Sequence, residues 1–215
     1  MTTLDSRRMT YLNCYGQKFS EPGTYRYRIM SSSTSGLERD ARFSIEVKPA
    51  AAQAKVRQHD IAVRLKGREL VADPPSVSVS AGDLVVWNTP DSSIAGYLIE
   101  GEGSGLSFSS ASLTREAVYT HAFGLPGTYR WLDANGGKLG GVIEVVSLKT
   151  GSRESSRKWL ESLGSPTLIT VRGDYADPEK VQILTGQTVA WAIEEAAGIS
   201  VTDSSVVPDG AAKRG

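Results

Sequence analysis

The chain repeats itself at an interval of 104 residues, and this period constrains its fold more than any other feature of the sequence. A first group of residues recurs at this interval: Tyr15, Phe19, Pro22, Gly23, Thr24, Tyr25 and Arg26 match Tyr119, Phe123, Pro126, Gly127, Thr128, Tyr129 and Arg130. A second group does the same: Ala72, Asp73, Pro74, Gly82, Val85 and Trp87 match Ala176, Asp177, Pro178, Gly186, Val189 and Trp191. Because a fixed period indicates repeated structural units, we expect one architecture throughout the chain.

The repeated stretches have the pattern of short β-strands. Residues 76–80, 83–88 and 141–146 are rich in Val and partly alternating, and Gly, Pro, Asp or Ser lie between such runs. Short runs of this kind, separated by turn residues, are typical of two packed antiparallel sheets. The sequence therefore predicts an all-β sandwich.

Two of the runs resemble the scaffold motifs of the cupredoxin family, the blue-copper sandwiches of the plastocyanin and amicyanin type. The first run is Ala81-Gly82-Asp83-Leu84-Val85-Val86-Trp87 with Asp91 following, and the second is Phe123-Gly124-Leu125-Pro126-Gly127-Thr128-Tyr129-Arg130-Trp131. The resemblance implies tandem Greek-key β-sandwiches.

The positions that bear copper ligands in that family hold other residues here. The resemblance places the four ligands of the central unit at Ala95, Asp133, Gly136 and Leu139, and two further ligand positions fall at Ile29 and Ile199. A blue-copper site needs two imidazoles and a thiolate converging on one metal, with a weak axial group. The chain has two histidines and one cysteine, none at these positions, so we expect no metal and no cofactor.

Aligned with the family pattern, the chain divides into one whole unit and two half-units. Residues 1–49 match the C-terminal half of a unit, 55–148 a complete unit and 166–215 the N-terminal half of another. A lone half-sandwich leaves unpaired strand edges, so we expect the 166–215 half to complete the 1–49 half. The alternatives are strand exchange between two chains, or a longer protein that holds the missing halves.

Residues 151–164 between the whole unit and the last half are predicted to form a linker helix. Ser152 can cap its start, Gly164 can end it, and Trp159, Leu160 and Leu163 share a face. That face either packs Trp159 against a sandwich or docks on a partner.

Charge and hydropathy exclude several classes of partner. Lys plus Arg equals Asp plus Glu at 24 each, which disfavours nucleic acid as a partner. No run of about 18 apolar residues is present, so no membrane span is expected. Arg7-Arg8 resembles part of an export signal, but polar residues follow it. A periplasmic or extracytoplasmic location is implied by the resemblance alone.

These observations predict a protein that is not an enzyme, binds no small-molecule substrate and serves as a structural subunit docked on other proteins. The resemblance implies a place on the periplasmic face of an electron-transfer complex, such as a photosynthetic reaction centre. The alternatives are a copper-binding electron carrier, a fragment of a multicopper enzyme, and an extracellular adhesive or sugar-binding sandwich. The predicted contact surface comprises Ala95, Gly96, Tyr97, Asp133, Asn135, Lys138, Leu139 and Trp159.

Overall fold

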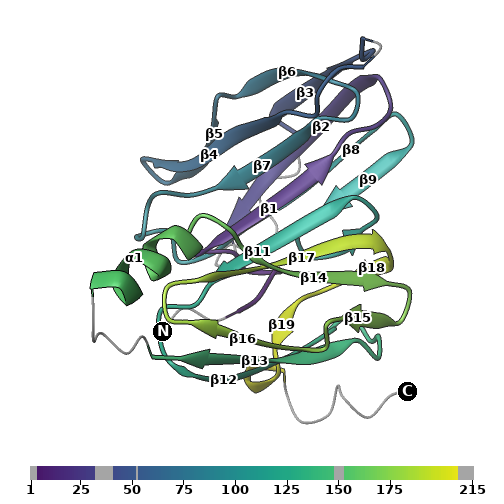
Figure 1. Cartoon of the computed structure of the whole chain (residues 1–215). Coiled ribbons are helices and arrows are strands. Elements are labelled where there is room, and N and C mark those ends of the chain that lie inside the picture. Colours follow the sequence, from purple (N-terminus) through teal and green to yellow (C-terminus); the bar gives the residue numbers. More distant parts are fainter. Residues whose placement is uncertain (1–3, 32–40, 52, 148–152, 208–215) are drawn as a thin grey trace.

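The computed structural model describes residues 4–31, 41–51, 53–147 and 153–207, and within them it shows an all-β protein with a single α-helix (Figure 1). The strands form sheets of eight, five, four and two strands, which confirms the predicted all-β sandwich. None of the described helices is long and apolar enough to cross a membrane.

The first sandwich uses strands β1 to β9. Its first layer is one half of the eight-stranded sheet: β1 (Asn13–Lys18), β7 (Leu84–Asn88), β4 (Gln58–Lys66) and β5 (Glu69–Asp73). Its second layer is the five-stranded sheet: β6 (Ser76–Ser80), β3 (Phe43–Lys48), β2 (Gly23–Ser31), β8 (Tyr97–Gly103) and β9 (Leu106–Ser109). The layers meet where the rings of Tyr27 and Phe108 pack on Trp87.

The second sandwich uses strands β10 to β19. Its first layer is the other half of the eight-stranded sheet: β11 (Ala117–Ala122), β17 (Thr188–Glu195), β14 (Thr167–Arg172) and β15 (Tyr175–Asp177). Its second layer is the four-stranded sheet: β16 (Lys180–Leu184), β13 (Gly140–Val146), β12 (Gly127–Leu132) and β19 (Thr202–Asp203). A small sheet of β10 (Leu113–Thr114) and β18 (Ala197–Ile199) and a 3₁₀ turn, η1 (Ser204–Val206), complete it.

The two sandwiches share one continuous sheet because β1 and β11 pair antiparallel, with Tyr15 opposite its repeat counterpart Tyr119. This pairing relates the two halves of the sheet by a local two-fold axis. One row of cross-strand partners runs through it and is 0% exposed throughout: Ile61, Trp87, Tyr15, Tyr119, Trp191 and Ile169. The row reads the same from both ends, so the repeat is built into the core itself.

The turns of the two sandwiches also correspond. Asp83 accepts the Ser80 amide through its carboxylate (Oδ2, 3.0 Å), and Gln187 accepts the Leu184 amide through its side-chain oxygen (Oε1, 2.6 Å). Both positions are 104 residues apart, so a charged and a neutral side chain close the same turn.

The predicted division of the chain is wrong in one respect, because the half-units find different partners. Strands of 13–48 pair with strands of 58–109, and strands of 113–146 pair with strands of 167–203. The predicted complete unit, 55–148, is therefore divided between two sandwiches at the β9–β10 connection. The physical reason is proximity along the chain: consecutive elements usually lie side by side, and short loops close at lower entropy cost.

The N-terminal segment, residues 4–9, joins the second layers of the two sandwiches. Asp5 pairs with Thr202 at the end of β19, and Met9 pairs with Tyr97 at the start of β8. The Leu4 and Met9 side chains are 1% and 0% exposed. This segment therefore fixes the position of one sandwich against the other.

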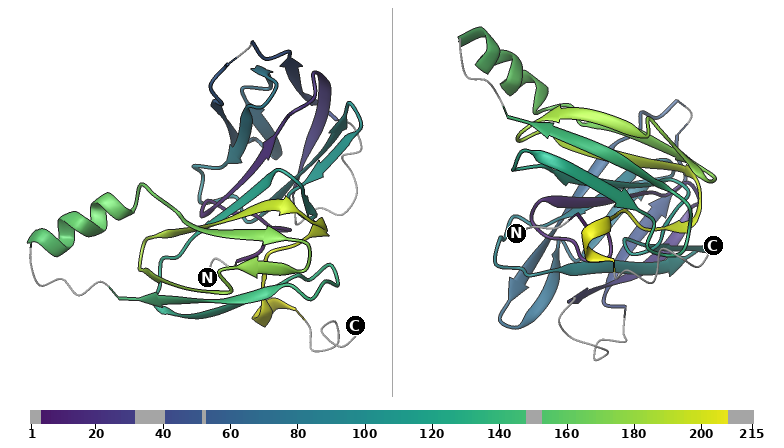
Figure 2. Two further views of the ribbon diagram at one scale, coloured as in Figure 1. Left: turned by 45° about the vertical axis from the view of Figure 1, so that its right-hand side comes forward. Right: turned by 90° about the horizontal axis from the view of Figure 1, so that it is seen from below.

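Helix α1 (Arg153–Ser162) lies within the predicted linker helix and projects from one end of the second sandwich (Figure 2). The Trp159 indole donates to the carbonyl of Thr185 (2.9 Å), and its ring lies against Gly186 in the β16–β17 turn. Leu160 is 60% exposed. The helix therefore packs through Trp159, as one of the two predictions required, and leaves Leu160 in solvent.

Candidate functional site

The predicted metal loop of the second sandwich is closed by hydrogen bonds around Asp133. This residue follows β12, and the chain after β18 brings Ser200 beside it. Asp133 Oδ1 accepts the backbone amides of Ser200 (2.8 Å) and Asn135 (2.9 Å), and Oδ2 accepts the amide of Gly137 (3.0 Å). A carboxylate that is only 6% exposed is thus stabilised by backbone N–H groups of its own loop and of β18's continuation.

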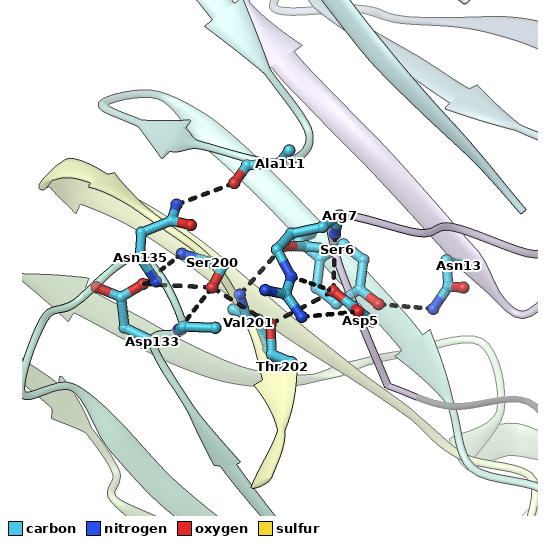
Figure 3. Close-up of polar contacts among 12 residues, drawn as sticks. Asp5, Ser6, Arg7, Asn13, Ala111, Asp133, Asn135, Ser200, Val201 and Thr202 are labelled. Atoms are coloured by element: carbon cyan, nitrogen blue, oxygen red, sulfur yellow. Dashed lines mark hydrogen bonds and ion pairs between the residues drawn. The ribbon is translucent and has the colours of Figure 1, made fainter. Parts of the chain in front are cut away.

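Hydrogen bonds extend from this loop to the N-terminal segment (Figure 3). The Ser200 hydroxyl accepts the amide of Ala134 (2.8 Å) and a hydrogen bond from the Thr202 hydroxyl (3.2 Å). Thr202 also donates to Asp5 (3.4 Å), whose carboxylate binds the Arg7 guanidinium (2.9 and 3.1 Å). The former metal end is therefore a hydrogen-bonded anchor for the start of the chain.

Other residues of the loop have separate roles. Asn135 donates through its amide to the carbonyls of Ala111 (3.0 Å) and Gly198 (3.1 Å), which ties the loop to the β9–β10 connection. Leu139 is buried, and Lys138 is exposed. Lys138 and Asn135 are thus the members of this loop that solvent or a partner can reach.

The corresponding end of the first sandwich is also closed by packing. Tyr97 is 0% exposed, and burial raises the pKa of its hydroxyl. Ile29, at the ligand position on β2, is 1% exposed and lies opposite Ile99. Ala95 is exposed, and its carbonyl accepts from Arg8 Nε (3.3 Å). The serine-rich loop that follows β2, 32–40, lies outside the described residues.

The predicted contact surface is only partly assembled. Residues 4–9 bring the Ala95–Tyr97 turn and the Ser200–Thr202 segment near each other, although they belong to different sandwiches. Trp159 lies at the opposite end of the second sandwich, beside the β16–β17 turn. Burial keeps four of the predicted residues from direct contact with a partner: Gly96, Tyr97, Asp133 and Leu139.

Copper does not fit the residues at these positions. A carboxylate whose oxygens already accept backbone amides, with Gly136, Leu139 and Ile199 around it in the predicted ligand set, offers neither imidazole nor thiolate. The described residues contain no cluster of three or more His, Cys, Asp or Glu side chains placed to hold a metal.

The two histidines are held in separate hydrogen bonds. His59 Nε2 contacts Asp83 Oδ2 (2.9 Å) in the first sandwich. In the second, the Asn13 side-chain amide lies 2.6 Å from His121 Nδ1 and 2.7 Å from the Tyr119 hydroxyl. Because an amide nitrogen only donates, His121 Nδ1 is an acceptor and the ring is neutral. Burial lowers the pKa of His121 from 6.5 to about 4.

Sequence reasoning missed two features of this region. Ser200 adjoins the predicted ligand position Ile199, and Asn13 precedes the repeat motif, but neither carries a motif of its own. An open groove of about 510 Å³ over β2, β8 and β9 was also unforeseen; it is lined by Arg26, Arg28, Ala41, Glu100, Gly101, Glu102, Ser107, Phe108, Ser109, Ser112 and Thr114. Arg28 and Glu100 form an ion pair there.

Comparison of the chain with protein families, with curated proteins and with solved structures finds no match. The geometry of the described residues is therefore the basis for a functional proposal.

Proposed function

We propose that this protein is a non-catalytic structural subunit, made of two metal-free sandwiches of cupredoxin type, that docks on other proteins. The observation that carries the proposal is the closed loop at Asp133. A buried carboxylate stabilised by the amides of Asn135, Gly137 and Ser200 makes the former metal end a rigid structural element.

The resemblance to cupredoxins extends the proposal to a location. We infer an extracytoplasmic place on a membrane electron-transfer complex, with a photosynthetic reaction centre as the example that motivated it. The exposed part of the predicted surface, Ala95, Asn135 and Lys138, is the region through which contact is expected. An adhesive or sugar-binding role has weaker support, because Phe108, the aromatic residue that lines the groove, is only 2% exposed.

The proposal is tested by extracting the native protein from membranes in mild detergent and separating complexes by size. We expect the protein to migrate with a large protein complex, and the purified chain to be colourless and free of copper by metal analysis. Lys138→Glu should reduce co-migration, whereas Lys48→Glu, an exposed lysine on β3, should not. A free chain that binds one equivalent of copper with blue absorbance would contradict the proposal.

A further inference from the structure

The outer face of the eight-stranded sheet is uncovered across both sandwiches. The second layers pack on the opposite face, where the Tyr15 and Tyr119 row is buried. Strand alternation places two other rows of cross-strand partners outward: Leu168, Ala190, Thr120, Cys14, Asn88 and Ala62 form one, and Thr170, Ala192, Val118, Gly16, Val86 and Asp60 form the other. Among the described residues, no layer covers these rows.

These two rows are chemically unusual for a sheet face in water. Asp60 is their only charged residue, whereas outward positions of antiparallel strands are ordinarily polar. The side chains are small, Leu168 being the largest at 53% exposed. Depletion of charged residues is the compositional signature of the core of a protein interface.

Charges at the margins of the face are already neutralised within the chain. Arg64 pairs with Asp73 (2.8 Å) at one side, and Arg172 pairs with Glu194 at the other. Lys18 pairs with Glu116 (3.0 Å) near the middle. The face therefore attracts neither an acidic nor a basic partner, and two such faces do not repel each other.

The size of the face suits a stable association. Eight strands spaced about 4.8 Å apart and about five residues long give roughly 650 Å² on one copy. Two such faces in contact bury about 1,300 Å² in total, which exceeds the roughly 1,000 Å² expected of a specific interface. Small side chains also permit sheets to pack at a spacing of about 10 Å.

The symmetry of the face favours a second copy as the occupant. The two-fold axis at the Tyr15–Tyr119 pair exchanges the two outward rows, so that Cys14 opposite Thr120 corresponds to Val118 opposite Gly16. A closed two-fold dimer brings the same patch of each copy together, which requires a patch that complements itself. A neutral, nearly symmetric face meets that requirement.

We propose that two copies of this chain associate face to face through the outer surface of the eight-stranded sheet. This dimer is independent of the former metal loops, because Asp133 and Ala95 lie outside both rows. It therefore stands or fails separately from the proposed docking on other subunits.

The test is sedimentation of the purified full chain from low to hundreds of micromolar concentration. The wild type is expected to reach twice the mass of the chain. Thr120→Arg and Ala192→Glu place opposite charges near the centre of the face, and each should raise the dimer dissociation constant at least about 100-fold, because an unpaired charge would be buried. Ser78→Arg, at an exposed position on β6 in the other layer, is the matched control and should leave the dimer intact.

Two further measurements separate loss of association from loss of folding. Circular dichroism and urea midpoints should show that both face variants are folded. In the wild type, Cys14 lies in one of the rows, so its reaction with a maleimide should slow as concentration rises. A wild type that stays monomeric throughout, a dimer that survives both charged variants, or a chain that dimerises only with a different protein would overturn the proposal.

Discussion

At the scale of single residues, Asp133 has a greater effect than its exposed neighbours because its hydrogen bonds are buried. Asp133→Ala removes the acceptor of three backbone amides and should lower the free energy of unfolding by about 2–4 kcal/mol. Lys138→Ala, five positions along the same loop and exposed, should change it by less than about 0.5 kcal/mol. Urea unfolding measures both, and equal effects of the two substitutions would refute the anchoring role of the carboxylate.

His121 should make stability depend on pH. Burial lowers its pKa from 6.5 to about 4, so the unfolded chain takes up a proton at a higher pH than the folded chain. Stability from the neutral ring is then complete above about pH 6.5, and about 3 kcal/mol is lost as pH falls to 4. Asp203, the acidic group acting on this ring, opposes the shift only in part.

His121→Gln supplies the control, because Gln17 occupies the equivalent position of the first repeat and does not titrate. Urea unfolding at intervals between pH 7 and pH 4 should show a flatter profile for this variant than for the wild type. Parallel profiles would mean that other groups cause the acid sensitivity.

At the scale of elements, the N-terminal segment acts as a brace between the second layers. Deletion of residues 1–8 removes the buried Leu4 side chain and the hydrogen bonds between Ser6 and Val201 (2.9 and 3.1 Å). The free energy of unfolding should fall by at least about 3 kcal/mol, comparable with a large-to-small core substitution. Tyr11→Ala, at a 46% exposed site just beyond the segment, should change it by no more than about 0.5 kcal/mol.

At the scale of the whole molecule, the shared sheet should make the two sandwiches unfold together. Neither the β1–β11 ladder nor the buried Tyr15–Tyr119 pair survives if one sandwich opens alone. Scanning calorimetry of the full chain should therefore give one transition whose van't Hoff enthalpy equals the calorimetric enthalpy, about 150 kcal/mol for a chain of 215 residues. Two transitions, each with about half of that enthalpy, would show that the sandwiches are independent.

Much of the fold could be predicted from local patterns. The alternation in β2 buries Tyr25, Tyr27 and Ile29, and the motif around Trp87 and Trp191 recurs in both halves of the sheet. The candidate site was less accessible, because Asp133 was expected at a loop, whereas its link to Ser200 joins residues 67 positions apart. No motif or spacing indicates that contact.

The sequence by itself determined the 104-residue period, the β-strands and the short helix, because strand alternation and turn residues act over a few positions. The tertiary structure alone decided which halves combine, since a period is the same wherever the repeat is cut. Loop-closure entropy favours the nearby pairing of β1–β3 with β4–β9, and the opposed Tyr15 and Tyr119 then join the two sandwiches into one sheet.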